Sequence, residues 1–494
     1  MLRRGALGGY RSRGVKNFTP SLQKRHMRSL DCGDHRPKGH HRFSHGTPDS
    51  TLMSRSSAVA QPPGRASGPR VVFVNRYFFP DQSATSRMLS DLAFRLVQRG
   101  VSVAVVTSRQ LYEDPRAALA RREVINGVAV YRVSTATRGR SRLLGRALDY
   151  ISFHAAAGLE LLQVLSKGDV VVAKTDPPLI SLVVSCAAVM RSAVLVNWVQ
   201  DLFPEVASVL TPGLIPTWLQ RMLVGARNHS LRRAAMNVVL GEGMRDRLLT
   251  AGVDPSRVRI VPNWADPACV VPQPTVSSET RRRLGLEGRF VLGYSGNLGR
   301  AHEFDTLIGT ARLLRTDPRF AFLITGGGAK ADALRDAVRA EGLDNFFFQD
   351  YQPAELLSDS LAAADVHFVS LLPALEGLIV PSKVYGILAA GRPAVFVGDP
   401  AGDLARMVTS EGCGIAVAVG DCTRLAAELT ALRDSPQRVA SMGLKARELA
   451  LSRYTSEHAV ANWVGFLQVV APSAILSTPP HPLPCEVHVT AEKR

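Results

Sequence analysis

Several features that mark other classes of protein are missing from this chain of 494 residues. No stretch reaches the roughly 18 uncharged apolar residues of a membrane-spanning helix, and the nearest approach, residues 179–190, ends at Arg191. The six cysteines form no CxxC pair and no spacing typical of metal ligands, which favours free thiols in a reducing compartment. No Asp-x-Asp pair stands on a loop suited to a metal. We therefore predict a cytoplasmic protein with no transmembrane span, no cofactor and no bound metal.

The body of the chain has the composition of a globular protein, with 46% hydrophobic and 21% charged residues. Its length is enough for two domains and tails. The expected parts are a disordered basic tail, an N-terminal domain, a linker, a C-terminal domain, a last amphipathic helix and a second disordered tail. They span residues 1–69, 70–264, 265–288, 289–452, 453–470 and 471–494.

The formal net charge of +18 is concentrated near the start of the chain, where residues 1–69 contribute more than half of it. Such a tail can bind nucleic acid or anionic lipid through charge alone. A disordered extension without a specific role explains the same composition, and the tail also has the Arg-rich, acid-poor character of organelle transit peptides. Met53 begins a plausible shorter start. We expect no specific nucleic-acid partner.

The N-terminal domain opens with the pattern of a doubly wound α/β sheet. A strand at 71–74, a helix at about 85–99 and a strand at 101–107 form a βαβ unit. The loop between the first strand and the helix reads Pro-Asp-Gln-Ser-Ala-Thr instead of G-x-G-x-x-G, which argues against an NAD-type site. Further strands are predicted at 169–173, 193–199, 237–240 and 259–263, with a hairpin at 124–132.

One carboxylate follows a strand of this domain at a position where ligands gather. Asp201 comes directly after the strand at 193–199, and open α/β sheets bind ligands at the carboxyl ends of their strands. A carboxylate there can orient an acceptor hydroxyl or take its proton. A helix N-cap or a salt bridge is the alternative interpretation.

The C-terminal domain carries loops that suit a phosphate. The strand at 290–295 runs into Gly296 and Gly299, and small residues let backbone amides approach an anion. A later strand at 366–372 leads through Pro381-Ser382-Lys383 into a helix at 384–390. Free amides, a helix start and the Lys383 charge indicate a diphosphate site. Ordinary turn chemistry and a solvent-facing lysine remain the alternatives.

Three motifs resemble one known family. The segments Ser295-Gly-Asn-Leu-Gly299 and "PSKxxxxLAAGRPxxF" (residues 381–396), with the start at 77–85, are similar to retaining glycosyltransferases of the family-4 group. These enzymes have the GT-B fold, in which two Rossmann-like domains face each other. The similarity is strongest to bacterial cell-surface polysaccharide transferases and covers roughly residues 71–468. It implies that the last helix crosses back onto the first domain.

The resemblance assigns roles to particular positions. It implies catalytic roles for Asp201 and Lys383 and an acceptor-side loop. It also implies a nucleotide-sugar site in the second domain. The acceptor-side positions are Asp81, Ser83 and Thr85, and the donor-side positions are Gly296, Asn297, Arg300, Gly326, Gly327, Tyr351, Glu376, Ser382 and Lys383.

The sequence also departs from the family pattern. Gln200 stands where many relatives have a histidine, and Asn297 and His302 stand where many have arginine and lysine. The family's two glutamates, one of which holds the ribose, correspond to Leu378 and Gly386 here. Glu376, two residues away from the first, could serve in part.

The resulting hypothesis is a transferase that moves a sugar, with retention, from a nucleotide diphosphate sugar to a hydroxyl group, without a metal. A UDP-sugar is the favoured donor and a lipid-linked or polysaccharide glycan the expected acceptor. The basic segment 138–146 could rest on an anionic membrane surface, at the inner face of the cell membrane, or be a solvated helix start. The rival functions are a nucleotide-sugar epimerase and a non-enzymatic nucleic-acid-binding protein.

Overall fold

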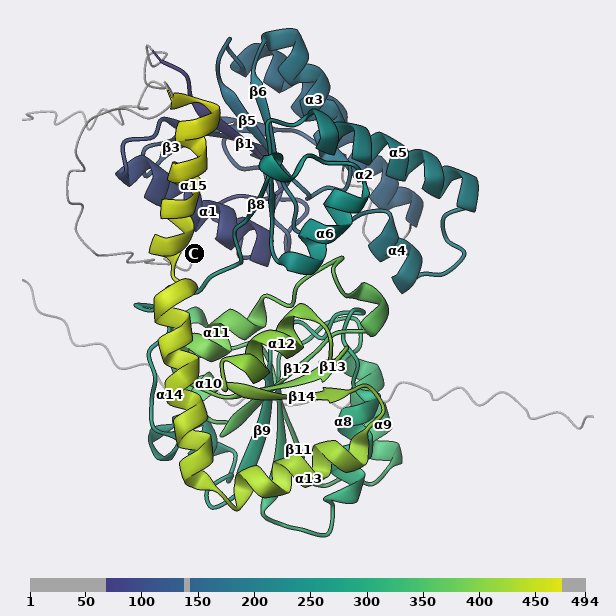
Figure 1. Cartoon of the computed structure of the whole chain (residues 1–494), viewed down its shortest axis with the longest axis vertical. Coiled ribbons are helices and arrows are strands. Elements are labelled where there is room, and N and C mark those ends of the chain that lie inside the picture. The colour runs from purple at the N-terminus through teal and green to yellow at the C-terminus, as the bar shows by residue number, and fades with distance from the viewer. Residues whose placement is uncertain (1–67, 137–142, 473–494) are drawn as a thin grey trace, which may run out of the picture. The chain divides into compact units, whose positions relative to one another are not determined.

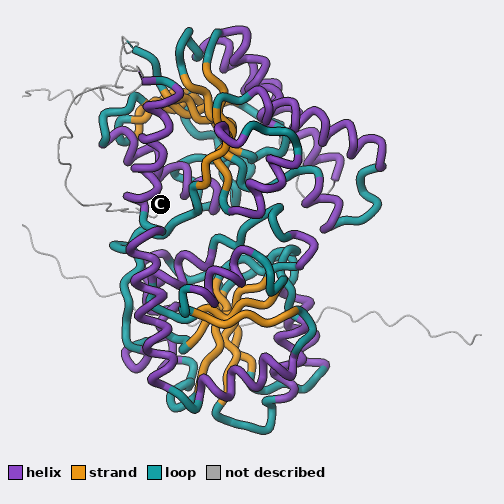
Figure 2. The backbone as a smooth tube through the Cα atoms, viewed as in Figure 1, coloured by secondary structure: helices purple, strands orange, loops and turns teal. Residues whose placement is uncertain are grey.

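A computed structural model describes residues 68–136 and 143–472 of the chain, and two β-sheets with helices around them make up this part (Figures 1 and 2). Nearly all of both expected tails, and the first half of the basic segment 138–146, lie outside the described residues. None of the helices in the described ranges is long and apolar enough to cross a bilayer.

The first sheet has eight strands in the order β3-β4-β2-β1-β5-β6-β7-β8, all parallel except the edge strand β3. Its strands are β1 (Val71–Val74), β2 (Val103–Ser108), β3 (Arg122–Ile125), β4 (Val128–Val133), β5 (Val170–Lys174), β6 (Val194–Trp198), β7 (Met236–Val239) and β8 (Val258–Ile260). Its helices are α1 (Ala84–Gln98), α2 (Leu143–Val164), α3 (Ile180–Arg191), α4 (Glu205–Leu210), α5 (Thr217–Arg233) and α6 (Glu242–Thr250).

Both faces of this sheet are covered, which explains why its central strands are apolar throughout. On β1, Val71 and Phe73 pack into one hydrophobic cluster, while Val72 and Val74 pack into a second cluster on the opposite face. Successive side chains of a strand point to opposite faces, so a strand buried on both sides needs apolar residues at every position.

The second sheet has six parallel strands in the order β11-β10-β9-β12-β13-β14. They are β9 (Phe290–Ser295), β10 (Phe320–Thr325), β11 (Phe346–Gln349), β12 (Val366–Ser370), β13 (Ala394–Gly398) and β14 (Gly414–Ala418). The helices are α7 (Glu279–Arg283), α8 (Asp305–Leu313), α9 (Ala331–Ala340), α10 (Leu357–Ala362), α11 (Lys383–Ala389), α12 (Asp403–Ser410), α13 (Cys422–Arg433), α14 (Pro436–Arg453) and α15 (Ser456–Val470). The predicted fold class, two doubly wound α/β units, is confirmed. The expected linker 265–288 contains helix α7.

The two sheet-bearing parts contact each other through backbone bonds and a shared apolar cluster. The amide of Leu202 donates to the carbonyl of Leu378 over 3.0 Å, and the amide of Gly243 donates to the Asp403 carboxylate over 2.8 Å. The last helix, α15, packs on the first sheet, where the Trp463 ring lies 5.0 Å from Trp198. Because α15 follows the second sheet in sequence, the chain passes between the two parts twice.

Candidate functional site

A pocket of about 550 Å³ lies at the carboxyl ends of the second sheet's strands, and we call it the strand-end pocket. The last residues of β9 and β10, the loops after β9 and β11, helix α10 and the first part of α11 line one side, and residues of α1 and of the segment after β8 line another. The lining includes the predicted residues Gly296, Tyr351, Ser382 and Lys383. It also includes residues that the sequence did not reveal: Arg87, Met88, Asp91, Trp264, Asp266 and Ser360.

Lys383 is the main cation of this pocket, and its ammonium group is held from three sides. Its Nζ donates to the hydroxyl of Tyr294, lies 3.4 Å from the carbonyl of Asn297 and lies 3.2 Å from Nε2 of His302. Burial lowers the pKa of Lys383 to about 7. Helix α11 has only seven residues, so the positive character of the site rests on this side chain more than on the helix dipole.

His302 fixes the orientation of the Lys383 ammonium. Its Nδ1 lies 2.6 Å from the carbonyl of Ser370 and must therefore carry the proton, which leaves Nε2 as an acceptor for Lys383. Burial and the nearby charges of Lys383 and Lys330 lower the pKa of His302 to about 4. The imidazole thus stays neutral at physiological pH and adds no second charge next to the lysine.

Two glycine-bearing loops come close enough to touch beside Lys383. The amide of Gly296 donates to the Thr325 carbonyl over 2.9 Å. A Cβ on Gly326 would lie 2.3 Å from the carbonyl oxygen of Gly296, and one on Gly328 would lie 2.3 Å from the side-chain oxygen of Asn297. Both glycines have positive φ. Only glycine fits there, so the loops after β9 and β10 form one backbone-lined wall.

The other predicted donor-side residues lie less directly on the pocket. Asn297 reaches Lys383 through its carbonyl, and Tyr351 donates its hydroxyl to the carbonyl of Gly327 over 3.1 Å. Arg300 is exposed to solvent. Asn297, Arg300, Gly326 and Gly327 do not belong to the pocket lining.

Glu376 requires a correction. Its carboxylate accepts a hydrogen bond of 2.8 Å from the amide of Asp403, at the start of α12, and it does not line the strand-end pocket. The unpaired amide of a helix start attracts a carboxylate, and this bond holds the Glu376 carboxylate at the start of α12. Gly386 does line the pocket, and a Cβ built on it would meet nothing within 4 Å.

The predicted acceptor-side residues form the turn after β1 and the start of α1. The Asp81 carboxylate accepts from the amide of Ser83 over 2.9 Å, from the Ser83 hydroxyl and from the amide of Tyr112. Thr85 donates its hydroxyl to Asp176 over 3.2 Å. Asp81 and Ser83 therefore shape the loop, whereas Thr85 joins a buried charged group.

That buried group centres on Lys174, which the sequence did not single out as a site residue. Lys174 is fully buried, donates to the carbonyl of Thr85 over 2.8 Å and lies 4.0 Å from the centre of the Trp198 ring. Burial lowers its pKa to about 7 although Asp176 opposes the shift, and burial raises the pKa of Asp176. The two charges stand at the carboxyl end of β5, where the strand passes into its loop.

Asp201 lies at the carboxyl end of β6, where its backbone bridges to Ile379 of the second part. It lines a small cavity of about 30 Å³ together with Lys174 and Asn197. Its Oδ1 is buried and has no hydrogen-bond partner among the described residues. Burial raises the pKa of Asp201 to about 6, although a hydrogen bond with Thr175 opposes the shift. Asp201 does not line the strand-end pocket.

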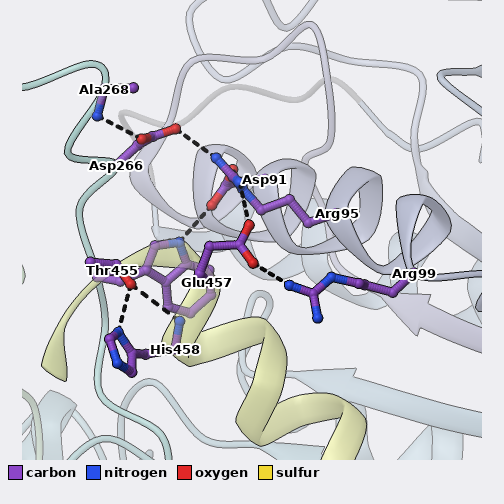
Figure 3. Close-up of polar contacts among 9 residues, drawn as sticks. Asp91, Arg95, Arg99, Asp266, Ala268, Thr455, Glu457 and His458 are labelled. Carbon is purple, nitrogen blue, oxygen red and sulfur yellow. Dashed lines mark hydrogen bonds and ion pairs between the residues drawn. The ribbon is translucent and has the colours of Figure 1, made fainter. Parts of the chain in front are cut away.

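One arginine joins three segments of the chain, two of which line the strand-end pocket (Figure 3). Arg95 of α1 lies 2.7 Å from Asp91, 2.6 Å from Asp266 and 3.1 Å from Glu457 of α15. The indole of Trp264 donates to Asp91 over 2.6 Å. Because Asp91, Trp264 and Asp266 all line the pocket, Arg95 fixes the shape of that wall.

The described residues contain no group of three or more His, Cys, Asp or Glu side chains placed to hold a metal ion. The charged groups at the pocket are the cations and carboxylates named above.

Comparison with known proteins gives matches over both parts of the chain. Residues 83–264 match the family model "Glycosyl transferase 4-like domain", and residues 289–435 match the model "Glycosyl transferases group 1". The chain is 28% identical over 281 residues to the probable glycosyltransferase WbjE of Pseudomonas aeruginosa, covering 56% of this chain and 68% of that protein. It is also 28% identical over 182 residues to WcaI of Escherichia coli (strain K12), a glycosyl transferase named for colanic acid biosynthesis. That match covers 36% of this chain and 44% of WcaI.

Solved structures share the fold. The Anabaena protein HepE, crystallised in complex with UDP, superposes with a TM-score of 0.61 at 15% identity over 81% of this chain and all of HepE.

Proposed function

The chain belongs to the GT-B glycosyltransferases, and we propose that it transfers a sugar from a nucleotide diphosphate sugar to a hydroxyl group of a lipid-linked or polysaccharide acceptor. UDP-sugars are the favoured donors. The observation that carries the proposal is the position of Lys383, whose ammonium lies within 3.4 Å of the carbonyl of Asn297, on the loop that Gly296 opens. The sequence resemblance assigns Gly296, Asn297 and Lys383 to one diphosphate site. Gly296 and Lys383 line the strand-end pocket, and Asn297 directly follows Gly296.

In the proposed reaction the bond between the anomeric carbon and the diphosphate breaks, the acceptor hydroxyl oxygen forms the new bond to that carbon, and the hydroxyl proton passes to the departing diphosphate. The departing diphosphate gains negative charge. Lys383, which lines the pocket, stabilises that charge. Arg87, which also lines the pocket, is a second cation available to it. We propose that these groups act without a divalent ion and that the configuration at the anomeric carbon is retained.

Transfer of a radiolabelled sugar to a membrane or polysaccharide fraction tests the function. The donor is first chosen by the increase in melting temperature that UDP-, GDP- and ADP-sugars produce, because a ligand that binds the native state raises it. Lys383→Ala should lower transfer about 100- to 1,000-fold. Lys445→Ala, an exposed lysine of α14 away from the pocket, is the matched control and should keep full activity. Full transfer by Lys383→Ala would contradict the proposal.

The stereochemistry and the metal requirement have separate tests. Nuclear magnetic resonance of the product should show the same anomeric configuration as the donor, and inversion would refute retention. Chelation with EDTA should leave the rate unchanged. Incubation of the donor without an acceptor distinguishes the epimerase alternative, because an epimerase changes the sugar of the nucleotide and a transferase leaves it intact.

Peripheral contact with an anionic membrane is part of the proposal and has one supporting feature. The helices α2, α3 and α5 pack side by side, with α3 between the other two (Figure 1). Together they expose large apolar side chains that are 63–68% accessible: Ile151, Leu159, Val189, Met190, Trp218 and Met222. Exposed arginines at the end of α5 accompany them, a combination that suits an anionic lipid surface. Trp218→Glu should reduce sedimentation with anionic vesicles, and an unchanged bound fraction would contradict the contact.

A further inference from the structure

One wall of the strand-end pocket contains a hydroxyl group without a hydrogen-bond partner. Ser360 of α10 lines the pocket and is 3% exposed, and its Oγ has no partner among the described residues. A buried hydroxyl that makes no hydrogen bond is costly and therefore uncommon. A ligand that supplies the missing partner would remove that cost.

The helix that carries Ser360 is firmly anchored. The side chain of Asp359 accepts from the amides of Glu279 and Thr280 over 2.7 and 3.0 Å. The Ser358 hydroxyl accepts from the amide of Val271 over 3.0 Å. Both polar neighbours of Ser360 are therefore satisfied within the protein. The Ser360 hydroxyl makes no such bond, so its rotation about χ1 toward the pocket breaks none.

The wall formed by α11 is bare at the point where a nucleoside would lie. Gly386 follows Lys383 by three residues, which is about 4.5 Å along a helix axis, and that distance is about the step from a diphosphate to its ribose. Gly386 lines the pocket, and the position of its missing Cβ has no atom within 4 Å. With the diphosphate at Lys383, the ribose would occupy this open space and meet no acceptor from α11.

We propose that Ser360 is a specificity-determining residue of the donor site, and that its hydroxyl binds the ribose of the nucleotide beside the open space at Gly386. This inference rests on the proposed function, because it places the diphosphate at Lys383. Ribose recognition then comes from α10, through a neutral hydroxyl, and not from a carboxylate on α11. Leu357, Leu361 and Ile387 complete the lining nearby. The sugar ring is thus packed between apolar side chains and held by one polar contact.

Calorimetric titration of the full chain with UDP, 2′-deoxy-UDP and the 3′-deoxy analogue tests the proposal. The wild type should bind UDP about tenfold more tightly than one of the two deoxy analogues, which is the effect of one neutral hydrogen bond. Ser360→Ala should bind UDP as weakly as the wild type binds that analogue. The variant should also bind UDP and that analogue equally well. Ser358→Ala removes the same group from the same helix at a site outside the pocket, and it should keep the tenfold preference.

A second variant tests the position of the ribose without depending on a hydrogen bond. Gly386→Leu places a side chain in the open space, where a Cβ at this position meets nothing within 4 Å, and the melting temperature of the free protein should stay within a few degrees. UDP should then bind at least tenfold more weakly. Unchanged UDP binding by Gly386→Leu, or full discrimination by Ser360→Ala, would overturn the inference and leave the proposed transferase function intact. Failure of the wild type to bind any of the three uridine nucleotides would overturn the inference, and failure to bind any of the UDP-, GDP- and ADP-sugars would overturn the proposed function.

Discussion

Lys383 is expected to take up a proton when the nucleotide sugar binds. Burial lowers the pKa of its ammonium group to about 7, and a diphosphate binds the charged form. About half of the free protein then carries the charge at pH 7, and about one molecule in eleven carries it at pH 8. Because the apparent Kd varies inversely with the competent fraction, it should rise about fivefold from pH 7 to pH 8 and about tenfold over the next unit.

The other groups in contact with the ammonium should not produce this slope. His302 accepts from Lys383 at 3.2 Å and has a pKa of about 4, so it is neutral across the range. Burial keeps the pKa of Tyr294 above its usual value, and this phenol stays protonated. Each phosphate of a nucleotide sugar carries one ester and one anhydride bond, so neither titrates between about pH 6 and pH 9.

Isothermal titration calorimetry at several pH values, in buffers of different ionisation enthalpy, measures both the Kd and the protons taken up. Lys383→Met should bind at least tenfold more weakly at pH 6.5 and show no dependence on pH. Lys174 has the same pKa of about 7 and serves as the control, since Lys174→Met should keep the slope. A wild-type Kd that is constant between pH 6.5 and pH 8.5 would refute the reasoning, as would an unchanged slope in Lys383→Met.

Three further results are expected from other parts of the molecule. Asp201→Asn should lower kcat about 100-fold with little change in the Kd for UDP. Wild-type kcat/KM should fall as the pH drops below about 6, because burial raises the pKa of the Asp201 carboxyl to about 6. A flat pH profile would contradict a role for the ionised carboxylate. Gly326→Ala should abolish UDP binding, since the new Cβ would lie 2.3 Å from the Gly296 carbonyl oxygen. Gly342 also has a positive φ, but a Cβ there would have no atom within 4 Å. Gly342→Ala should therefore lower the free energy of unfolding by only about 1 kcal/mol and keep UDP binding. Arg95→Met should lower the free energy of unfolding by about 1–2 kcal/mol, a small loss because the ion pairs that it removes are partly solvated. Scanning calorimetry that shows no fall in melting temperature would argue against the role of Arg95 in joining the three segments.

The fold could be predicted because buried parallel strands consist of continuous runs of apolar residues. Val71–Val74 and Ala394-Val-Phe-Val397 are both entirely buried, as their composition indicates. Short runs identify strands but not their partners. The rules for doubly wound topology restrict the order of strands, but the order that each sheet has is not predicted from the sequence. The elements between β13 and α14 are not assigned individually from the sequence, although β14 is an apolar run of the same kind.

The part of the site that the sequence revealed consists of residues at the ends of neighbouring strands. Gly296, Tyr351 and Lys383 come together because their strands are parallel and end at one edge of the sheet. The pocket residues from α1 and from the segment after β8 do not follow a strand of this sheet, so their sequence positions did not indicate a site. Asp91 lies in the middle of α1, and Asp266 lies in the expected linker. Their approach to the pocket depends on how Arg95 joins distant segments, which no local pattern records.

Glu376 shows why a carboxylate near the right position need not have the expected role. Glu376 lies two residues from the position of one of the family's glutamates, so the sequence suggests that it takes over part of the role of that glutamate. In the folded chain its carboxylate instead meets the amide of Asp403, which follows it by 27 residues. A carboxylate bonded to a helix start gains both a hydrogen bond and a favourable dipole, and it would lose both by turning to a ribose. A buried group that recognises the nucleoside needs hydrogen bonds that are still unmade, and the Ser360 hydroxyl on the pocket wall is buried and meets this condition.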